Sequence, residues 1–346
     1  MGLQRVLLAG AGAVAVGMLA GAARAGSFVY TSFDIVGGQL ASDATDINDA
    51  GQVWGSYADA SNNQFAFVYA GGTTTSIAVL PSNSSGVYTG RINANGLATG
   101  AVYDGMVKPQ RYQPFTYDTN SSAATIYSIK TTYGSFPLGI NNAGSIVGWT
   151  VGKAANAPFK GFDIVGGAIG KVTVKGSKST NPTGINDAGQ ICGAYVDAGG
   201  VQHGFLLTGK KLTTIDPAGS TDTWASFVNN AGEVGGYYSD SQNSTHGFTL
   251  NGGVIATANY PGAVQTVLNR SASNGILAGY YEDGAGATHG MLYQGGHFTS
   301  VDYPGAVFTN LLAVNAGGSA VGLYRDAAGV YHGFLASCPA GQFPCS

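Results

Sequence analysis

One pattern of short apolar stretches separated by glycine-rich turns runs through the chain. It is clearest in Gly189–Phe205, where apolar and small residues alternate, a turn follows, and His-Gly-Phe begins another apolar stretch. The pattern occurs seven times, at steps of 43 to 48 residues, with a second glycine four residues after each opening glycine. A fixed period of this length indicates a repeat architecture. The opening glycines are Gly51, Gly96, Gly144, Gly189, Gly232, Gly275 and Gly318.

Each repeat predicts four strands. The first strand ends in an asparagine in six copies, and the tetrad Asn-x-x-Gly that follows predicts a tight turn. The second strand is exemplified by Gln52–Asp59, the third by His203–Leu207 and the fourth by Lys211–Asp216. The glycine inside the second strand, such as Gly236, is expected to let the backbone of an adjacent sheet come close. The repeats show no helical periodicity.

Four antiparallel strands in each of seven copies predict an all-β fold, a seven-bladed β-propeller that spans 27–337 as one domain. A β-solenoid is the alternative. The two ends of the pattern favour the propeller, because the last copy stops after its third strand, at Ser337, and Tyr30–Asp34 matches the fourth strand Phe298–Asp302. In a closed ring, the N-terminal strand completes the last blade and removes an exposed edge.

The repeated residues also carry a family resemblance. The signature Gly-x-x-x-Gly-x-Tyr-x-Asp followed by His-Gly-Phe resembles the bacterial extracellular repeats called the HAF family, over nearly all of 27–337. The resemblance implies propeller-type repeats in an extracellular protein and transfers no catalytic residue. Copies two and three lack the histidine and have longer loops, at Gly105–Pro114 and Gly152–Pro158.

The first 25 residues predict a signal peptide. Arg5 precedes the apolar run Val6–Leu19, and Ala23-Arg24-Ala25 has the pattern of a cleavage site. A retained membrane anchor is the rival interpretation, but the run is short and the cleavage pattern follows it at once. We expect the protein to be secreted or periplasmic, with cleavage after Ala25 and no membrane span in the mature chain.

Composition and charge narrow the range of partners. Only 10% of the residues are charged and the net charge is −3, so nothing in the charge pattern indicates binding to nucleic acid or to an anionic membrane. The 56 glycines and 19 tyrosines suit many short turns and an amphipathic surface. We expect a monomer.

The three cysteines fall into two groups. Cys338 and Cys345 lie in the C-terminal tail, 338–346, where export would permit a disulfide between them. Cys192 takes a position that other copies fill with valine, so we expect a buried, unreactive side chain.

Four copies place an aspartate six residues before the histidine. A metal site or acid–base pair is one interpretation of these residues. We favour a repeated loop clasp, since a catalytic pair is needed at one centre and these pairs recur. No cofactor and no metal are expected. The pairs are Asp197 and His203, Asp240 and His246, Asp283 and His289, and Asp326 and His332.

Residues that break the repeat are the better candidates for a ligand site. In a propeller, the connection between blades and the loop between the second and third strands share one face, where most ligands bind. Aromatic and occasional charged residues in the connections would suit stacking on sugar rings or gripping a polymer. Ordinary loop variation is the alternative. The candidates are Tyr88, Arg91, Tyr133, Asp222, Trp224 and Arg270.

The sequence favours a binding function over catalysis. It contains no nucleophile elbow, zinc-protease motif or phosphate-binding loop. We expect a non-enzymatic exported propeller that recognises a glycan, a surface polymer or a protein. The alternative is an extracellular hydrolase or lyase, with Asp222, Arg91 or Arg270 near the channel, because propeller enzymes can assemble sites from scattered loop residues.

Overall fold

The computed structural model describes residues 28–35, 39–77, 86–104, 111–130, 133–152, 154 and 157–338. Within these ranges the chain forms 28 strands and no helix. The predicted signal peptide, Cys345 and parts of both longer loops lie outside the described residues. The strands are β1 (Val29–Ser32), β2 (Ala41–Ile47), β3 (Val53–Ala58), β4 (Gln64–Ala70), β5 (Thr73–Ile77), β6 (Val87–Ile92), β7 (Leu97–Asp104), β8 (Arg111–Asp118), β9 (Ala123–Ile126), β10 (Gly134–Ile140), β11 (Ile146–Val151), β12 (Lys160–Val165), β13 (Ala168–Val172), β14 (Ser179–Ile185), β15 (Ile191–Val196), β16 (Gln202–Thr208), β17 (Lys211–Ile215), β18 (Ser220–Val228), β19 (Val234–Asp240), β20 (Thr245–Asn251), β21 (Val254–Thr257), β22 (Gln265–Ser271), β23 (Leu277–Glu282), β24 (Thr288–Gln294), β25 (His297–Ser300), β26 (Phe308–Val314), β27 (Ala320–Arg325) and β28 (Tyr331–Ser337).

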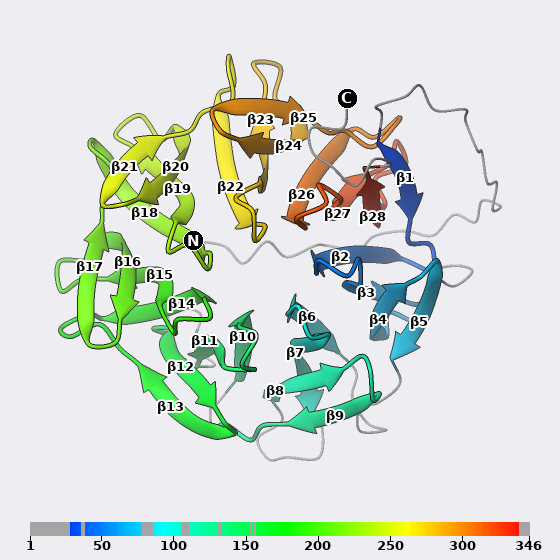
Figure 1. The fold of residues 1–346 in the computed structure, drawn as a ribbon, viewed down its shortest axis with the longest axis horizontal. Helices are drawn as coiled ribbons and strands as arrows, with labels where there is room; N and C mark the ends of the chain where they lie inside the picture. Colours follow the sequence, from blue (N-terminus) through cyan, green and yellow to red (C-terminus); the bar gives the residue numbers. More distant parts are fainter. Residues whose placement is uncertain are drawn as a thin grey trace.

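Consecutive strands pair antiparallel in groups of four, which we call units. β14, β15, β16 and β17 form such a group in sequence order, as do β2, β3, β4 and β5. The units surround a central axis, with the first strand of each unit innermost and the fourth outermost (Figure 1). Adjacent units touch where a third strand meets the next first strand, for example at Thr245 and Gln265. This arrangement is of the propeller type.

The strand near the N-terminus pairs with the last strand. β1 lies antiparallel to β28, with Tyr30 opposite Ala336 and Ser32 opposite Phe334. The backbone N–H of Phe33 also donates to the carbonyl of Gly333, at 2.8 Å. The pairing that the sequence predicts for this segment is therefore present.

Asparagines at the ends of the innermost strands connect neighbouring units. The side-chain amide of Asn48 donates to the backbone carbonyl of Asn93 at 3.0 Å. The side-chain amide of Asn93 donates in turn to the backbone carbonyl of Asn141 at 2.9 Å. We call this series the asparagine row. It continues through later units, and Asn315 donates back to the carbonyl of Asn48 at 3.2 Å. The sixth copy has Ala272 at this position and interrupts the row.

The repeated glycine of the second strand is required for a different reason from the one that the sequence suggested. A Cβ atom on Gly236 would collide with the carbonyl oxygen of Trp224 and the nitrogen of Ser226, both in the first strand of the same unit. A β-bulge between Ala225 and Phe227 accompanies this close approach. The expectation that an adjacent sheet comes close there was wrong.

The glycine of His-Gly-Phe is the one that faces a neighbouring unit. A Cβ on Gly333 would meet the backbone of Asp43 and Ala44 in β2. The residue that follows is fully buried, as at Phe205 and Phe248, because it points into the apolar layer between units. The signature therefore encodes packing between units.

The two described cysteines are both buried and differ in bonding. Cys192 is buried beside Thr183, and burial raises the pKa of its thiol to about 12. It therefore stays protonated and unreactive. Cys338 is disulfide-bonded, while Cys345 is not among the described residues. None of the described residues forms a helix long and apolar enough to cross a membrane.

Candidate functional site

The paired aspartates and histidines approach one another in all four units that contain them. His332 Nε2 lies 3.3 Å from Asp326, and its Nδ1 lies 2.8 Å from Asp34, a residue that follows β1. A second partner after the fourth strand is thus part of the clasp. The distances between the predicted partners are 3.6 Å for His203 and Asp197, 3.1 Å for His246 and Asp240, 3.4 Å for His289 and Asp283, and 3.3 Å for His332 and Asp326.

This second partner was not identified from the sequence, although within one copy it follows the histidine at a fixed spacing of 13 residues. Asp216 contacts His203 at 2.9 Å and Asp302 contacts His289 at 3.0 Å. In the fifth unit an asparagine, Asn259, contacts His246 instead. The clasp therefore holds two carboxylates in three units and one carboxylate in the fifth.

The clasps are charged but repeat as structural elements do. Partial burial lowers the pKa of the His332 imidazole, but hydrogen bonds and charge from Asp34 and then Asp326 outweigh this, so its pKa is raised above the usual value. The ring also stacks on Tyr324, with centroids 4.9 Å apart. The same stacking recurs at His289. This repetition suits a loop clasp.

Two predicted candidates, Tyr88 and Tyr133, belong to one aromatic cluster. Their side chains are 42% and 47% exposed. The Tyr88 ring contacts Phe136 edge-on at 5.7 Å, Phe136 lies 5.2 Å from Tyr112, and Tyr112 lies 6.4 Å from Tyr133. We call Tyr88, Tyr112, Tyr133 and Phe136 the tyrosine surface. The contacts continue through Trp149 below it.

Trp224 and Asp222 lie elsewhere, on β18. The Trp224 ring stacks on Tyr237 of β19, with centroids 6.4 Å apart and planes 15° from parallel. Burial, then Tyr280 and Asp222, raise the pKa of Tyr237 to about 12. These aromatic residues form a second, smaller group that is joined to the tyrosine surface by no ring contact within the described residues.

Arg91 and Arg270 lie near the C-terminal ends of their strands, β6 and β22. Both lie near the asparagine turns, not in the connections where ligands were expected to bind. Tyr88, Asp222 and Trp224 also lie within first strands, so the predicted placement in the connections was wrong for every candidate except Tyr133, which precedes β10.

The strand register shifts at both arginines, between Thr89 and Ile92 around Arg91 in β6 and between Leu268 and Arg270 in β22. Arg270 Nη2 lies 3.5 Å from Asp46 Oδ2 of β2. We call Arg91, Arg270 and Asp46 the axial cluster.

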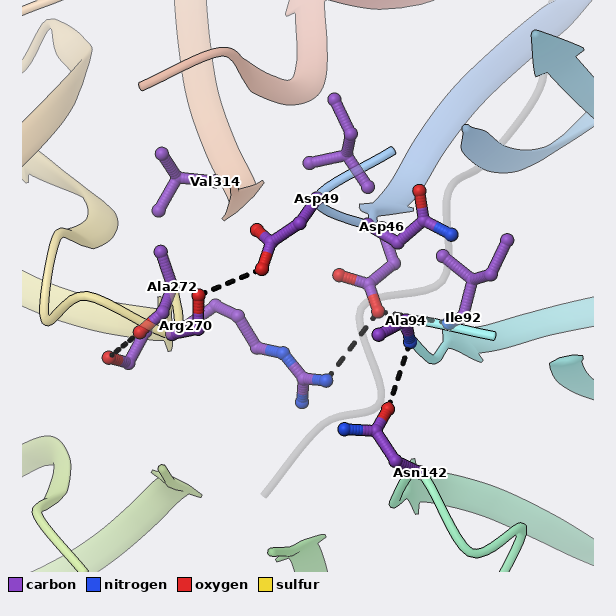
Figure 2. A pocket seen from close by; sticks show the side chains of 12 residues that line it. Asp46, Asp49, Ile92, Ala94, Asn142, Arg270, Ala272 and Val314 are labelled. Carbon is purple, nitrogen blue, oxygen red and sulfur yellow. Dashed lines mark hydrogen bonds and ion pairs between the residues drawn. The ribbon is translucent and has the colours of Figure 1, made fainter. Parts of the chain in front are cut away.

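The axial cluster combines buried charge with an adjacent pocket. The Asp46 side chain is 3% exposed, and its Oδ2 accepts the backbone N–H of Ile92 at 3.0 Å. Desolvation, then the charge of Arg270, lower the pKa of Arg91 to about 10. A pocket of about 130 Å³ opens beside Arg270, and Asp49 and Asn142 also line it (Figure 2).

Several site residues were absent from the sequence-based candidates. Asp46 resembles a turn residue in sequence, and its partner Arg270 is more than 200 positions away. A usable signal existed for Tyr237, since the residue after the repeated glycine varies strongly between copies. That position holds Ser56, Ala101, Trp149, Ala194, Tyr237, Tyr280 and Leu323.

Metal and acid–base chemistry have limited support in this arrangement. The described part of the chain contains no group of three or more His, Cys, Asp or Glu side chains able to hold a metal ion. Burial raises the pKa of the Asp43 carboxyl, which accepts hydrogen bonds from the backbone and hydroxyl of Ser56. The carboxyl is therefore held by its own unit and does not point to a reacting partner.

Comparison with known proteins places the fold in the propeller class. No family model matches the sequence. No curated protein matches it. Solved propeller-type structures do match, all with low sequence identity, so the likeness establishes the fold alone.

Three of these structures illustrate the likeness. The oligogalacturonate lyase of Vibrio parahaemolyticus has a TM-score of 0.58 at 10% identity, covering 90% of this chain and 97% of that one. The β-propeller domain of the Trilobed protease from Pyrococcus furiosus has a TM-score of 0.54 at 9% identity, covering 86% and 94%. TolB from Acinetobacter baumannii has a TM-score of 0.50 at 11% identity and covers 84% of this chain. This chain spans 64% of that TolB chain, less than two thirds of it.

Proposed function

We propose that the chain is a seven-bladed propeller of the HAF-repeat type, exported from the cell and closed by its N-terminal strand. The spacing of the seven copies supports the blade count. The pairing of β1 with β28 supports the closure, as does the hydrogen bond from Asn315 to Asn48, which joins the last copy to the first. Each blade would then have four strands.

We propose that this propeller is a binding protein, with no catalytic role, that recognises a glycan on an extracellular polymer. The carrying observation is the tyrosine surface, in which two exposed tyrosines rest on a continuous aromatic cluster. Tyrosine rings stack on the apolar faces of sugars, while their hydroxyls hydrogen-bond to sugar hydroxyls. The rings beneath hold the exposed ones in place, which limits the entropy lost on binding. A protein partner is the other ligand class that such a surface suits.

The divergence of copies two and three supports this location. These copies lack the histidine clasp, and they contribute every residue of the tyrosine surface. A surface formed where the repeat pattern is relaxed is typical of a site shaped for a ligand.

A glycan array probed with the purified protein tests this proposal. We expect Tyr133→Ala and Tyr88→Ala each to weaken binding at least about tenfold, with the melting temperature little changed, because stacked aromatic residues dominate such contacts. Tyr331→Ala is the matched control, since Tyr331 packs edge-on against Phe308 in the last unit. Unchanged glycan binding by both tyrosine variants would show that the tyrosine surface is not the glycan-binding site.

An extracellular hydrolase or lyase is the second candidate function. The observation in its favour is the axial cluster, where three ionisable side chains converge. Asp222, which was expected to join them, lies beside Tyr237 instead. Release of reducing ends or unsaturated products from acidic polysaccharides, abolished by Arg270→Gln, would support catalysis. Absence of turnover on a polymer that the protein binds would favour the binding function.

A further inference from the structure

We propose that the axial cluster binds a small oxyanion, the carboxylate or phosphate group of a soluble ligand. The site would lie at the asparagine-turn end of the axis, and of the tyrosine surface Tyr88 is close enough to Arg91 for the two to interact electrostatically. Its ligand would contact the guanidinium group of Arg270, which lines the adjoining pocket (Figure 2). Arg91 does not line that pocket and would act from beside it, where it donates to the carbonyl of Thr45.

The first support is an imbalance of buried charge. Two guanidiniums face one buried carboxylate, that of Asp46, which contacts Arg270 at 3.5 Å. Arg91 donates instead to the neutral carbonyl of Thr45, at 3.0 Å. The cluster therefore carries one excess positive charge, and a bound anion would neutralise it.

The two nearby carboxylates, those of Asp49 and Asp43, do not cancel the excess positive charge of the axial cluster. Asp49 also lines the pocket, but it is exposed, and it accepts hydrogen bonds from Ser273 and from the backbone of Ala316. Its charge is therefore screened by solvent and engaged by local donors. Asp43, on the same strand as Asp46, accepts its hydrogen bonds from Ser56.

The repulsion between the arginines supports the same conclusion. The charge of Arg270 acts with desolvation to lower the pKa of Arg91 to about 10, so the two guanidiniums are close enough to destabilise each other. An oxyanion bound at Arg270 would offset this repulsion, because its negative charge attracts both guanidiniums. Arginine suits the task because its planar fork can hold two oxygens of one carboxylate or phosphate.

The pocket has room for a small ligand, and its wall departs from the repeat pattern. Its volume of about 130 Å³ exceeds what a single water needs. Ala272 lines it at the position where the other units have asparagine, so the carboxamide that continues the row elsewhere is missing here. Ser271 and Ser273 make this wall polar. The interruption of the asparagine row and the arginine pair therefore coincide.

Isothermal titration at low ionic strength tests the proposal, with D-glucuronate, D-glucose and inorganic phosphate as separate titrants. We expect binding of glucuronate, phosphate or both, and none of glucose. Arg270→Gln should weaken oxyanion binding at least about tenfold, as loss of a charge-assisted hydrogen bond does. Arg91→Gln removes a nearby positive charge and should weaken binding by a smaller factor. Lys211→Gln, which removes an exposed positive charge on β17, is the matched control.

A variant that is expected to strengthen oxyanion binding makes the test more specific. Asp46→Asn keeps an acceptor for the Ile92 N–H but removes the competing charge, so oxyanion binding should strengthen several-fold. Arg270→Lys, which keeps the charge, guards against misfolding and should bind more weakly than the parent. Binding of phosphate alone would make the inorganic ion the ligand, and binding of glucuronate alone would make it a carboxylate. The proposal would be overturned if the parent protein bound neither anion, or if both arginine-to-glutamine variants bound the anions as tightly as the parent. Tyr133→Ala should leave oxyanion binding unchanged, which separates this site from the tyrosine surface.

Discussion

The histidine clasps and the axial cluster are both built from opposite charges, but they differ in number and burial. The clasp occurs in four units with similar distances and lies partly exposed at the loops. The axial cluster occurs once, its carboxylate is almost fully buried, and its members come from three different units. In a repeat protein, a feature found in most copies serves the fold, and a feature found once is the better candidate for a ligand site.

The first prediction concerns a residue found in every copy, and it should have the largest effect. Gly236→Val would push a branched side chain into the backbone of β18 at the bulge, since the carbonyl of Trp224 occupies that space. Because backbone cannot move aside as a flexible side chain does, we expect a loss of more than about 3 kcal/mol in the free energy of unfolding. Denaturant unfolding measures it.

Gly284→Val provides the control. Gly284 has no neighbouring atom within 4 Å of its would-be Cβ and no positive φ, so the change should stay within about 0.5 kcal/mol. Equal stability of the Gly236 and Gly284 variants would show that the repeated glycine is not a packing requirement.

The second prediction compares the two charged regions directly. Asp46→Ala leaves the N–H of Ile92 and the charge of Arg270 without their acceptor, so we expect a loss of about 2 to 3 kcal/mol. Asp326→Ala removes a carboxylate from an exposed clasp and should cost less than about 1 kcal/mol. Chemical denaturation of both variants at pH 7 gives the two values. A larger loss for Asp326 would reverse the comparison.

The third prediction, with the smallest effect, concerns pH. The pKa of His332 is raised in the folded state, so its contribution is fully present below the unfolded histidine pKa and is lost as pH rises through the folded value. The aspartate partners have lowered pKa values, so their contribution is lost in acid. The clasp should therefore stabilise most between about pH 4 and 6.5.

Thermal unfolding between pH 5 and 8 checks this sign. His332→Gln should reduce the fall in stability with rising pH, by less than about 1 kcal/mol. An identical slope in the parent and the His332 variant would mean that this clasp adds no proton-linked stability.

The repeated parts of the molecule could be predicted because their residues recur at fixed spacing. The first strands, the asparagine turns and the pairing of the Tyr30 segment with the last copy followed from that spacing alone. The role of Gly236 was mistaken because spacing does not reveal which backbone lies opposite a glycine.

The axial cluster could not be predicted, for two physical reasons. Asp46 and Arg270 meet only because strands from units one and six both approach the axis, which no local pattern encodes. The register irregularities at Arg91 and Arg270 also shift which side of the strand each side chain occupies, and a period-two pattern hides that shift. Tyr88 and Tyr133 were identified because aromatic residues that break a repeat stand out.

The asparagine row has a consequence for how such a chain could change in length. Between units, each asparagine amide of the row donates only to the unit that follows, as Asn48 does to Asn93. Duplication or deletion of one asparagine-bearing repeat by recombination would therefore leave the same bonds available and require no new chemistry. The reach of Arg270 to Asp46, in contrast, depends on the width of the ring. A protein that gained or lost one repeat would keep its fold and lose that contact, so the arginine pair ties this chain to its present size.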